Sequence, residues 1–193
     1  MTASSSKLFS LSNTIALIES FSPSPKYLCQ LKAKTAVLEL LTQGDRVLWR
    51  SHFEPGHVTA SSWIISPCGG KVLLCYHRMA QRWLQLGGHV DGEADVAAAA
   101  LREAQEESGL SEFDFVTNEV FDLDVHHIPA RADEPQHLHF DIRFLLQARS
   151  DDIVCSAESL ALQWVYHHDI PSLTDEFSIH RMADIANSFL LDP

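Results

Sequence analysis

Long apolar runs are absent from this chain of 193 residues. No stretch approaches the roughly 18 consecutive apolar residues that a membrane-spanning helix needs, which argues against a transmembrane segment. The mildly apolar stretch Leu8 to Ile18 is interrupted by polar side chains, and it has neither a basic start nor a small-residue cleavage site. We therefore interpret it as mature protein and not as a signal peptide, and we expect no membrane partner.

Cysteine is also sparse, with four residues and no CxxC pair among them: Cys29, Cys68, Cys75 and Cys155. Scattered cysteines of this kind favour buried free thiols in a protein of the reducing cytoplasm.

Basic side chains are few, since 14 Lys and Arg stand against 26 Asp and Glu, for a net charge of −12. Residues 1–80 carry 8 basic and 4 acidic side chains, whereas residues 81–193 carry 6 basic and 22 acidic ones. So acidic a chain disfavours nucleic-acid polymers as partners. It suits a protein that recruits cations and handles a small phosphorylated substrate through them. A homodimer is also possible from the sequence.

Of the 193 residues, 46% are hydrophobic, which is enough for one domain with a hydrophobic core and an additional N-terminal segment. Residues 1–55 are expected to form a helical N-terminal arm, with helices near 14–21 and 27–42 and a short helix or turn at 47–53. Residues 56–193 are expected to form the main, catalytic domain.

Alternating and β-branched segments predict the strands of that domain. They lie at 57–66, 71–77, 113–128 (long, with room for a bulge), 136–148 and 160–166. In the fourth of them Leu138 and Phe140 share one face, while His139 and Asp141 share the other. A helix is expected at 177–191. Strands mixed with a central and a closing helix predict an α/β sandwich.

The most informative stretch runs from Leu86 to Leu110. A glycine-rich turn at Gly87–Gly88 is expected to lead into a helix that is capped by Asp95 and ended by Gly109. Three glutamates fall on one face of this helix: Glu103, Glu106 and Glu107. They are either a solvated acidic face or a site for a hard divalent cation, and the glycines favour the site because backbone oxygens can join it.

This stretch resembles the signature of the Nudix hydrolases. The matching positions are Gly88, Arg102, Glu103, Glu106, Glu107, Gly109 and Leu110. Two positions depart from it, because Ala94 stands where the first Glu is usual, with Glu93 one residue early, and Ala104 takes a bulky apolar position. The resemblance implies an α/β/α sandwich with a mixed sheet. It also implies hydrolysis of a diphosphate in a nucleoside diphosphate derivative with Mg²⁺ or Mn²⁺.

From the resemblance we assign Glu103 and Glu107 as the main metal ligands, Glu106 as ligand or base, and the Gly87 carbonyl as a further ligand. Arg102 would orient these carboxylates instead of touching the substrate. The general base is either a glutamate of the motif or a carboxylate of the polar loop 129–135. In that loop Glu134 and Asp133 are the candidates, although a solvated loop residue is the simpler role for Glu134.

Other residues are candidates for binding the substrate. Arg78 and Arg82 are cations for its phosphates, and His89 could contact phosphate if protonated. Trp83 and Phe121 could stack on a base, or belong to the core. A second group shares one strand face and could line the pocket, form a solvated face or bind a transition metal: His137, His139 and Asp141.

Two other functions remain open from the sequence. One is an isomerase acting on an isoprenoid diphosphate, which would require Cys75 or Cys155 beside the carboxylates. The other is a sensor that binds a nucleotide or sugar diphosphate without cleaving it, which the replacement at Ala94 favours.

Overall fold

A computed structural model describes residues 10–157 and 159–191 of the chain. Its eight strands belong to one mixed sheet: β1 (Gly56–Ile65), β2 (Lys71–His77), β3 (Arg82–Leu84), β4 (Leu86–His89), β5 (Phe113–Phe115), β6 (Asp122–Ile128), β7 (His137–Ala148) and β8 (Ser159–Tyr166). The α-helices are α1 (Leu11–Ser20), α2 (Leu28–Leu41), α3 (Val96–Ser108), α4 (Ile170–Leu173) and α5 (Phe177–Leu191). Two 3-10 helices are η1 (Asp45–Leu48) and η2 (His167–Asp169).

The sheet is built on one long parallel pair, β1 and β7, whose register runs from Gly56 opposite Leu138 to Ile65 opposite Gln147. The other edge of β1 pairs first with β4 and then, near its end, with β2. The other edge of β7 pairs first with β6 and then with β5. Residues far apart in sequence therefore meet at the start of this central pair.

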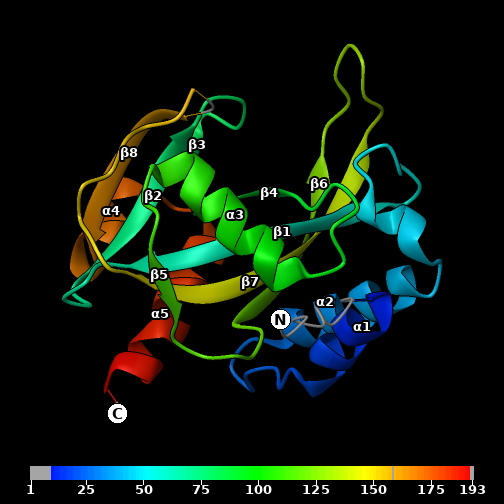
Figure 1. Cartoon of the computed structure of the whole chain (residues 1–193), viewed down its shortest axis with the longest axis horizontal. Helices are drawn as coiled ribbons and strands as arrows, with labels where there is room; N and C mark the ends of the chain where they lie inside the picture. The colour runs from blue at the N-terminus through cyan, green and yellow to red at the C-terminus, as the bar shows by residue number, and fades with distance from the viewer. Residues whose placement is uncertain (1–9, 158, 192–193) are drawn as a thin grey trace, which may run out of the picture.

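Helices cover both faces of the sheet, with α3 across one face and α5 on the other (Figure 1). Alternate residues of the central strands face opposite ways. Ala60 and Ile142 enter the core cluster on the side of α2 and α3, whereas Trp63 and Leu145 pack with Ile179 and other residues of α5. The expected α/β sandwich with a mixed sheet is confirmed.

The N-terminal helices α1 and α2 lie beside one end of the sheet (Figure 1). Buried side chains of both, Ile18 and Val37, share a single cluster with Val58 of β1 and Phe140 of β7. The 3-10 helix η1 follows them and leads into a turn in which the His52 amide donates to the Trp49 carbonyl at 2.9 Å, within the range where a short helix or a turn was expected. The arm therefore packs as part of the main core, and the domain boundary at residue 55 stays a prediction.

Three expectations differ from the structure. Gly87 and Gly88 lie in strand β4, and the turn comes later, at Asp91 and Gly92, whose φ angles are both positive. The expected strand 113–128 is divided into β5 and β6, which both pair with β7 and are separated by an excursion at 117–120. Of the cysteines, Cys75 alone is buried, while Cys68 and Cys155 are exposed; all four are free.

None of the helices in the described part of the chain is long and apolar enough to span a membrane.

Candidate active site

Helix α3 begins and ends where its sequence predicts. The Asp95 side chain accepts a hydrogen bond from the Ala98 amide at 3.0 Å, which satisfies one of the free N–H groups of the first turn. Gly109 takes a left-handed conformation at the other end, with φ of 71°. Small side chains between them, Ala100 and Ala104, are buried, so the helix lies close on the sheet.

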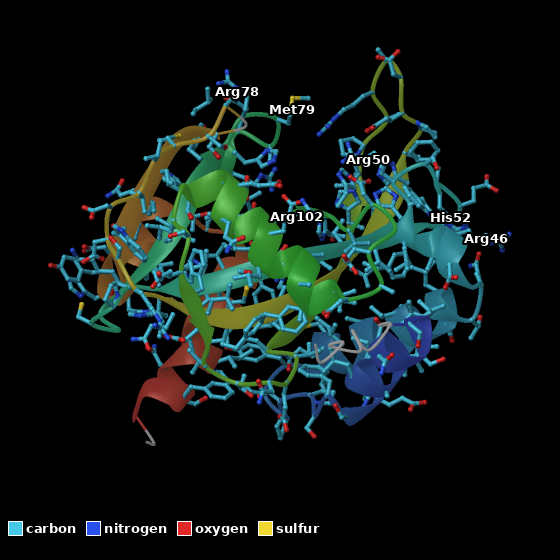
Figure 2. The ribbon with its side chains drawn as sticks, viewed as in Figure 1. Arg46, Arg50, His52, Arg78, Met79 and Arg102 are labelled. Atoms are coloured by element: carbon cyan, nitrogen blue, oxygen red, sulfur yellow. The ribbon has the colours of Figure 1, made fainter. Side chains whose placement is uncertain are left out.

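The Arg102 guanidinium joins α3 to β4. One nitrogen, Nη1, donates to Glu103 Oε1 at 2.7 Å and to Glu106 Oε2 at 3.1 Å. The other, Nη2, donates to the His89 carbonyl at 2.9 Å. Figure 2 shows Arg102 extending from the middle of α3. These charge-assisted bonds fix two carboxylates against a strand, and the role of Arg102 in orienting metal ligands stays a prediction.

Glu107 and Glu103 meet the two glycines of β4 directly. The Gly87 amide donates to Glu107 Oε2 at 2.7 Å, and Glu107 is only 4% exposed. A Cβ atom added to Gly88 would lie 2.5 Å from Glu103 Oε2, so a glycine leaves the space that this carboxylate occupies. Both glycines therefore serve to bring the backbone against acidic side chains.

The donor set fits a hard divalent cation. Three glutamates and Arg102 sum to a charge of −2 in a small region, and the side chains of Glu103 and Glu106 are 13% and 61% exposed. Carboxylate oxygens beside backbone carbonyls are the ligands that Mg²⁺ and Mn²⁺ prefer. Glu103 and Glu107 lie inside, while Glu106 lies at the rim in contact with solvent.

Contacts with the arm hold the loop between β4 and α3. Arg50 binds Asp91 through two hydrogen bonds, of 2.8 and 2.5 Å, and the Thr14 hydroxyl donates to the Ala94 carbonyl at 2.5 Å. Ala94 thus packs against the arm. The Glu93 carboxylate accepts from the Asp95 amide at 3.1 Å, so it helps to cap α3.

Arg50, which no sequence pattern singles out, binds Asp91 on the loop between β4 and α3. Its pKa is raised first by the hydrogen bond to Asp91, and also by the charges of Glu103 and Glu134. The charges of Arg50 and of these two carboxylates thus act on one another. Figure 2 shows Arg50 on the segment that precedes β1.

Several candidates lie elsewhere. Arg78 donates to the Ala157 carbonyl, and Figure 2 places it at the β2–β3 connection. Arg82 forms an ion pair with Glu176 next to α5. The Trp83 ring packs against the core cluster that holds the buried Phe121, so both aromatic candidates serve packing.

Histidines gather on one face of the sheet near the start of β1 and β7. His57 lies opposite His139, and His139 lies opposite His126. The His89 ring is centred 5.0 Å from the His57 ring. Burial, and next the charge of Arg50, lowers the pKa of His89 to about 4, so it is uncharged at neutral pH. Burial likewise lowers the pKa of His139 and of His57.

The same face continues into a buried polar network, so it is not the solvated face that was one expectation. Asp141 is 1% exposed and accepts hydrogen bonds from Thr59, Ser61 and Arg143. His137, at 4%, is also buried. Pocket lining and metal binding remain as roles for the two histidines of β7.

Cys75 lies near the carboxylates but is a poor nucleophile. Burial, followed by the charge of Glu107, raises the pKa of its thiol to about 12. Cys155 is exposed on the segment before β8, with its Sγ next to the Ser156 and Ser159 carbonyls. A reactive cysteine beside the glutamates, which an isomerase would need, is thus not provided by Cys75.

Comparison with known proteins identifies related chains. The model of the NUDIX domain matches residues 36–184. The fold is similar to an Ap4A hydrolase of C. elegans (TM-score 0.56, 20% identity, 69% of this chain and 97% of that one). It is also similar to a NUDIX-family hydrolase of Clostridium perfringens (0.54, 27%, 69% and 97%) and to the Nudix hydrolase RenU of M. smegmatis (0.52, 20%, 71% and 88%). A sequence search of curated proteins finds no match.

Proposed function

The chain belongs to the Nudix family of pyrophosphohydrolases, and we propose that it is a divalent-metal-dependent enzyme that cleaves a phosphoanhydride bond in a nucleoside diphosphate derivative or a similar small substrate. The observation that carries this proposal is the attachment of the α3 carboxylates to β4. Arg102 holds Glu103 and Glu106 there, and the Gly87 amide holds Glu107.

Glu103 and Glu107, with the Gly87 carbonyl, would hold Mg²⁺ or Mn²⁺, and Glu106 would complete the set or act at its rim. Such a cation, when bound, neutralises the diphosphate oxygens and acidifies the attacking water. The protein contributes the fixed geometry, because Arg102 of the same helix orients Glu103 and Glu106, and the Gly87 amide of β4 orients Glu107.

Two carboxylates are candidates for the proton acceptor. Glu106 is on the motif helix and is 61% exposed, so water reaches it. Glu134 comes from the loop before β7, and its charge acts on Arg50. A general base must lie within hydrogen-bonding reach of the attacking water. We propose Glu106 for this role because Arg102 holds it beside the metal ligand Glu103, and we keep Glu134 as the alternative.

The basic residue that we propose for binding the substrate phosphates differs from those predicted from the sequence. Arg78 donates to the Ala157 carbonyl and Arg82 pairs with Glu176, whereas Arg50 binds Asp91 on the loop between β4 and α3. The charge of Arg50 also acts on Glu103 and on His89. We therefore propose Arg50 as a phosphate-binding residue and His89, His137 and His139 as uncharged lining of the pocket. A guanidinium that already holds Asp91 is well placed to bind a phosphate oxygen as well.

The proposal is tested by measuring hydrolysis of nucleoside triphosphates, dinucleotides and sugar nucleotides with Mg²⁺ or Mn²⁺. Dinucleotides are included because one structural neighbour is an Ap4A hydrolase. Wild-type protein should turn over at least one class. Glu107→Gln should lower kcat by about a hundredfold or more, since a metal ion supplies several kcal/mol of charge stabilisation.

Glu119→Gln is the matched control, because Glu119 is an exposed glutamate on the excursion between β5 and β6. It should keep full activity. Undiminished turnover in Glu107→Gln would refute the assignment, and tight binding without turnover in the wild type would favour a sensor.

A further inference from the structure

Three histidines converge where β1 and β7 begin: His57, His137 and His139. Each can offer one ring nitrogen such that the three nitrogens all lie within 4.8 Å of one another. His57 and His139 are direct cross-strand partners in the parallel register, and His137 comes two residues before His139 on the same strand face. The sheet itself thus sets their spacing.

The backbone holds two of these rings by one nitrogen and leaves the other available. His57 Nδ1 lies 3.2 Å from the His52 carbonyl, and His137 Nδ1 lies 2.8 Å from the Pro135 carbonyl. Since a carbonyl accepts, each Nδ1 carries the proton and donates it, and each Nε2 keeps its lone pair. Metal-binding histidines are oriented by this kind of bond to the far ring nitrogen.

The inward nitrogens are short of partners. The Nε2 atoms of His57 and His139 are buried, and neither has a hydrogen-bond partner within residues 10–157 and 159–191. Leaving buried polar atoms unpaired is unfavourable, so two of them side by side need an explanation. A bound cation would satisfy both at once.

We propose that His57, His137 and His139 bind a transition-metal cation of the Zn²⁺ or Co²⁺ class at a site separate from the glutamates. Imidazole nitrogen suits these borderline cations, whereas Mg²⁺ prefers oxygen. Bonds of about 2.0–2.1 Å place tetrahedral ligands about 3.4 Å apart, so the rings need only draw together slightly.

The surroundings agree with a closed, specific site. The Phe53 ring is centred 5.2 Å from the His137 ring and covers it from the arm. Burial lowers the pKa of His57, so its ring is uncharged at neutral pH, which is the form that binds a metal. Two of the three ligands, His137 and His139, are residues that we propose above as lining of the substrate pocket, so the metal site adjoins that pocket. No Nudix-motif glutamate is a ligand, and metal binding is therefore measured separately from hydrolysis.

The test uses untagged full-length protein stripped with a chelator and titrated with Co²⁺ in the presence of excess Mg²⁺, which occupies the oxygen site. Visible absorption reports nitrogen ligation, and equilibrium dialysis counts bound metal. We expect one equivalent of Co²⁺ with a visible band, displaced by Zn²⁺. Absence of any bound Co²⁺ in the wild type would overturn the proposal.

Variants locate the site. His139→Gln and His137→Gln should each lose the band and most of the bound Co²⁺, with circular dichroism showing that they fold. His127→Gln is the matched control, because His127 lies opposite Leu138 on the other face of the same strand pair; it should keep both. Glu107→Gln should also keep both. A band lost in Glu107→Gln, or retained in a folded His139→Gln, would contradict the proposal.

Discussion

Gly88 and the Glu103 carboxylate occupy neighbouring space, with 2.5 Å between a Cβ at Gly88 and Glu103 Oε2. Gly88→Ala should therefore push this carboxylate aside, which costs little stability because the side-chain end is flexible. We expect activity to fall about 10- to 100-fold, as when the support of a metal ligand is lost. Steady-state kinetics and a melting curve on the same sample check this.

Gly87→Ala provides the contrast. Its φ is 152°, and a Cβ there would meet the Ser61 Cα at 2.5 Å, which is backbone and cannot give way. This variant should lose stability as well as activity. Equal melting temperatures for the two variants would contradict the account of both glycines.

The two thiols Cys68 and Cys75 should differ strongly in reactivity. Hydrogen bonding to Ser66 lowers the pKa of the exposed Cys68, whereas burial raises that of Cys75 to about 12. Since the thiolate is the reactive form, an alkylating reagent at pH 8 should label Cys68 quickly and Cys75 hardly at all. Peptide mass mapping over time measures this difference. Rapid labelling of Cys75 in folded protein would contradict it and would favour the alternative function as an isomerase.

For single residues, the sequence predicts those candidates whose partners lie close to them along the chain. The three glutamates, Arg102 and their glycines fall within 23 residues, and helix geometry alone brings the acidic side chains together. Arg50 and His57 could not be found this way. They reach the site through the arm and through the parallel pairing of β1 with β7, whose register no local pattern encodes.

Helix α5 is attached to the sheet by buried charges and by packing. Asp122, which is fully buried, accepts hydrogen bonds from Arg181 of α5, Arg143 of β7 and Gln30 of α2. Asp122→Ala leaves buried guanidinium groups with fewer partners. We expect it to lower the free energy of unfolding by about 3–5 kcal/mol at pH 7, measured in urea.

Asp114→Ala is the control for this network. Asp114 pairs with Arg149 through two hydrogen bonds, but both side chains are more than half exposed. A solvent-exposed pair contributes little to stability, because water screens the charges, so Asp114→Ala should leave the free energy of unfolding nearly unchanged. Similar losses in both variants would contradict the role given to burial.

Elements with a clear local pattern were predicted with near-correct ends. Helix α5 matches its predicted range, and α3 begins after Asp95 and ends before Gly109. In β7, the alternation correctly predicts that Leu138 and Phe140 face the hydrophobic core. The glycines of β4 were predicted as a turn because glycine favours turns, whereas here they let α3 approach a strand. The break between β5 and β6 depends on pairing with β7, which the sequence does not show.

At the scale of the whole molecule, the arm and the sheet share one core, so they should unfold together. Ile18 of α1 is fully buried in the cluster that includes β1 and β7. Ile18→Ala should cost about 2–5 kcal/mol. Circular dichroism and tryptophan fluorescence should still report a single coincident transition, and an early separate loss of helix signal would show that the arm folds on its own.

The central claim is that Glu103 and Glu107 together hold a divalent cation, and thermal unfolding at increasing Mg²⁺ tests it most directly. A cation bound only to the folded form adds about 2.7 kcal/mol at a hundredfold excess over Kd, or about 5–11 °C in Tm for a chain of this size. The wild type should show such a rise, and Glu103→Gln combined with Glu107→Gln should not. A Tm that does not respond to Mg²⁺ in the wild type, or that rises equally in the double variant, would contradict the account.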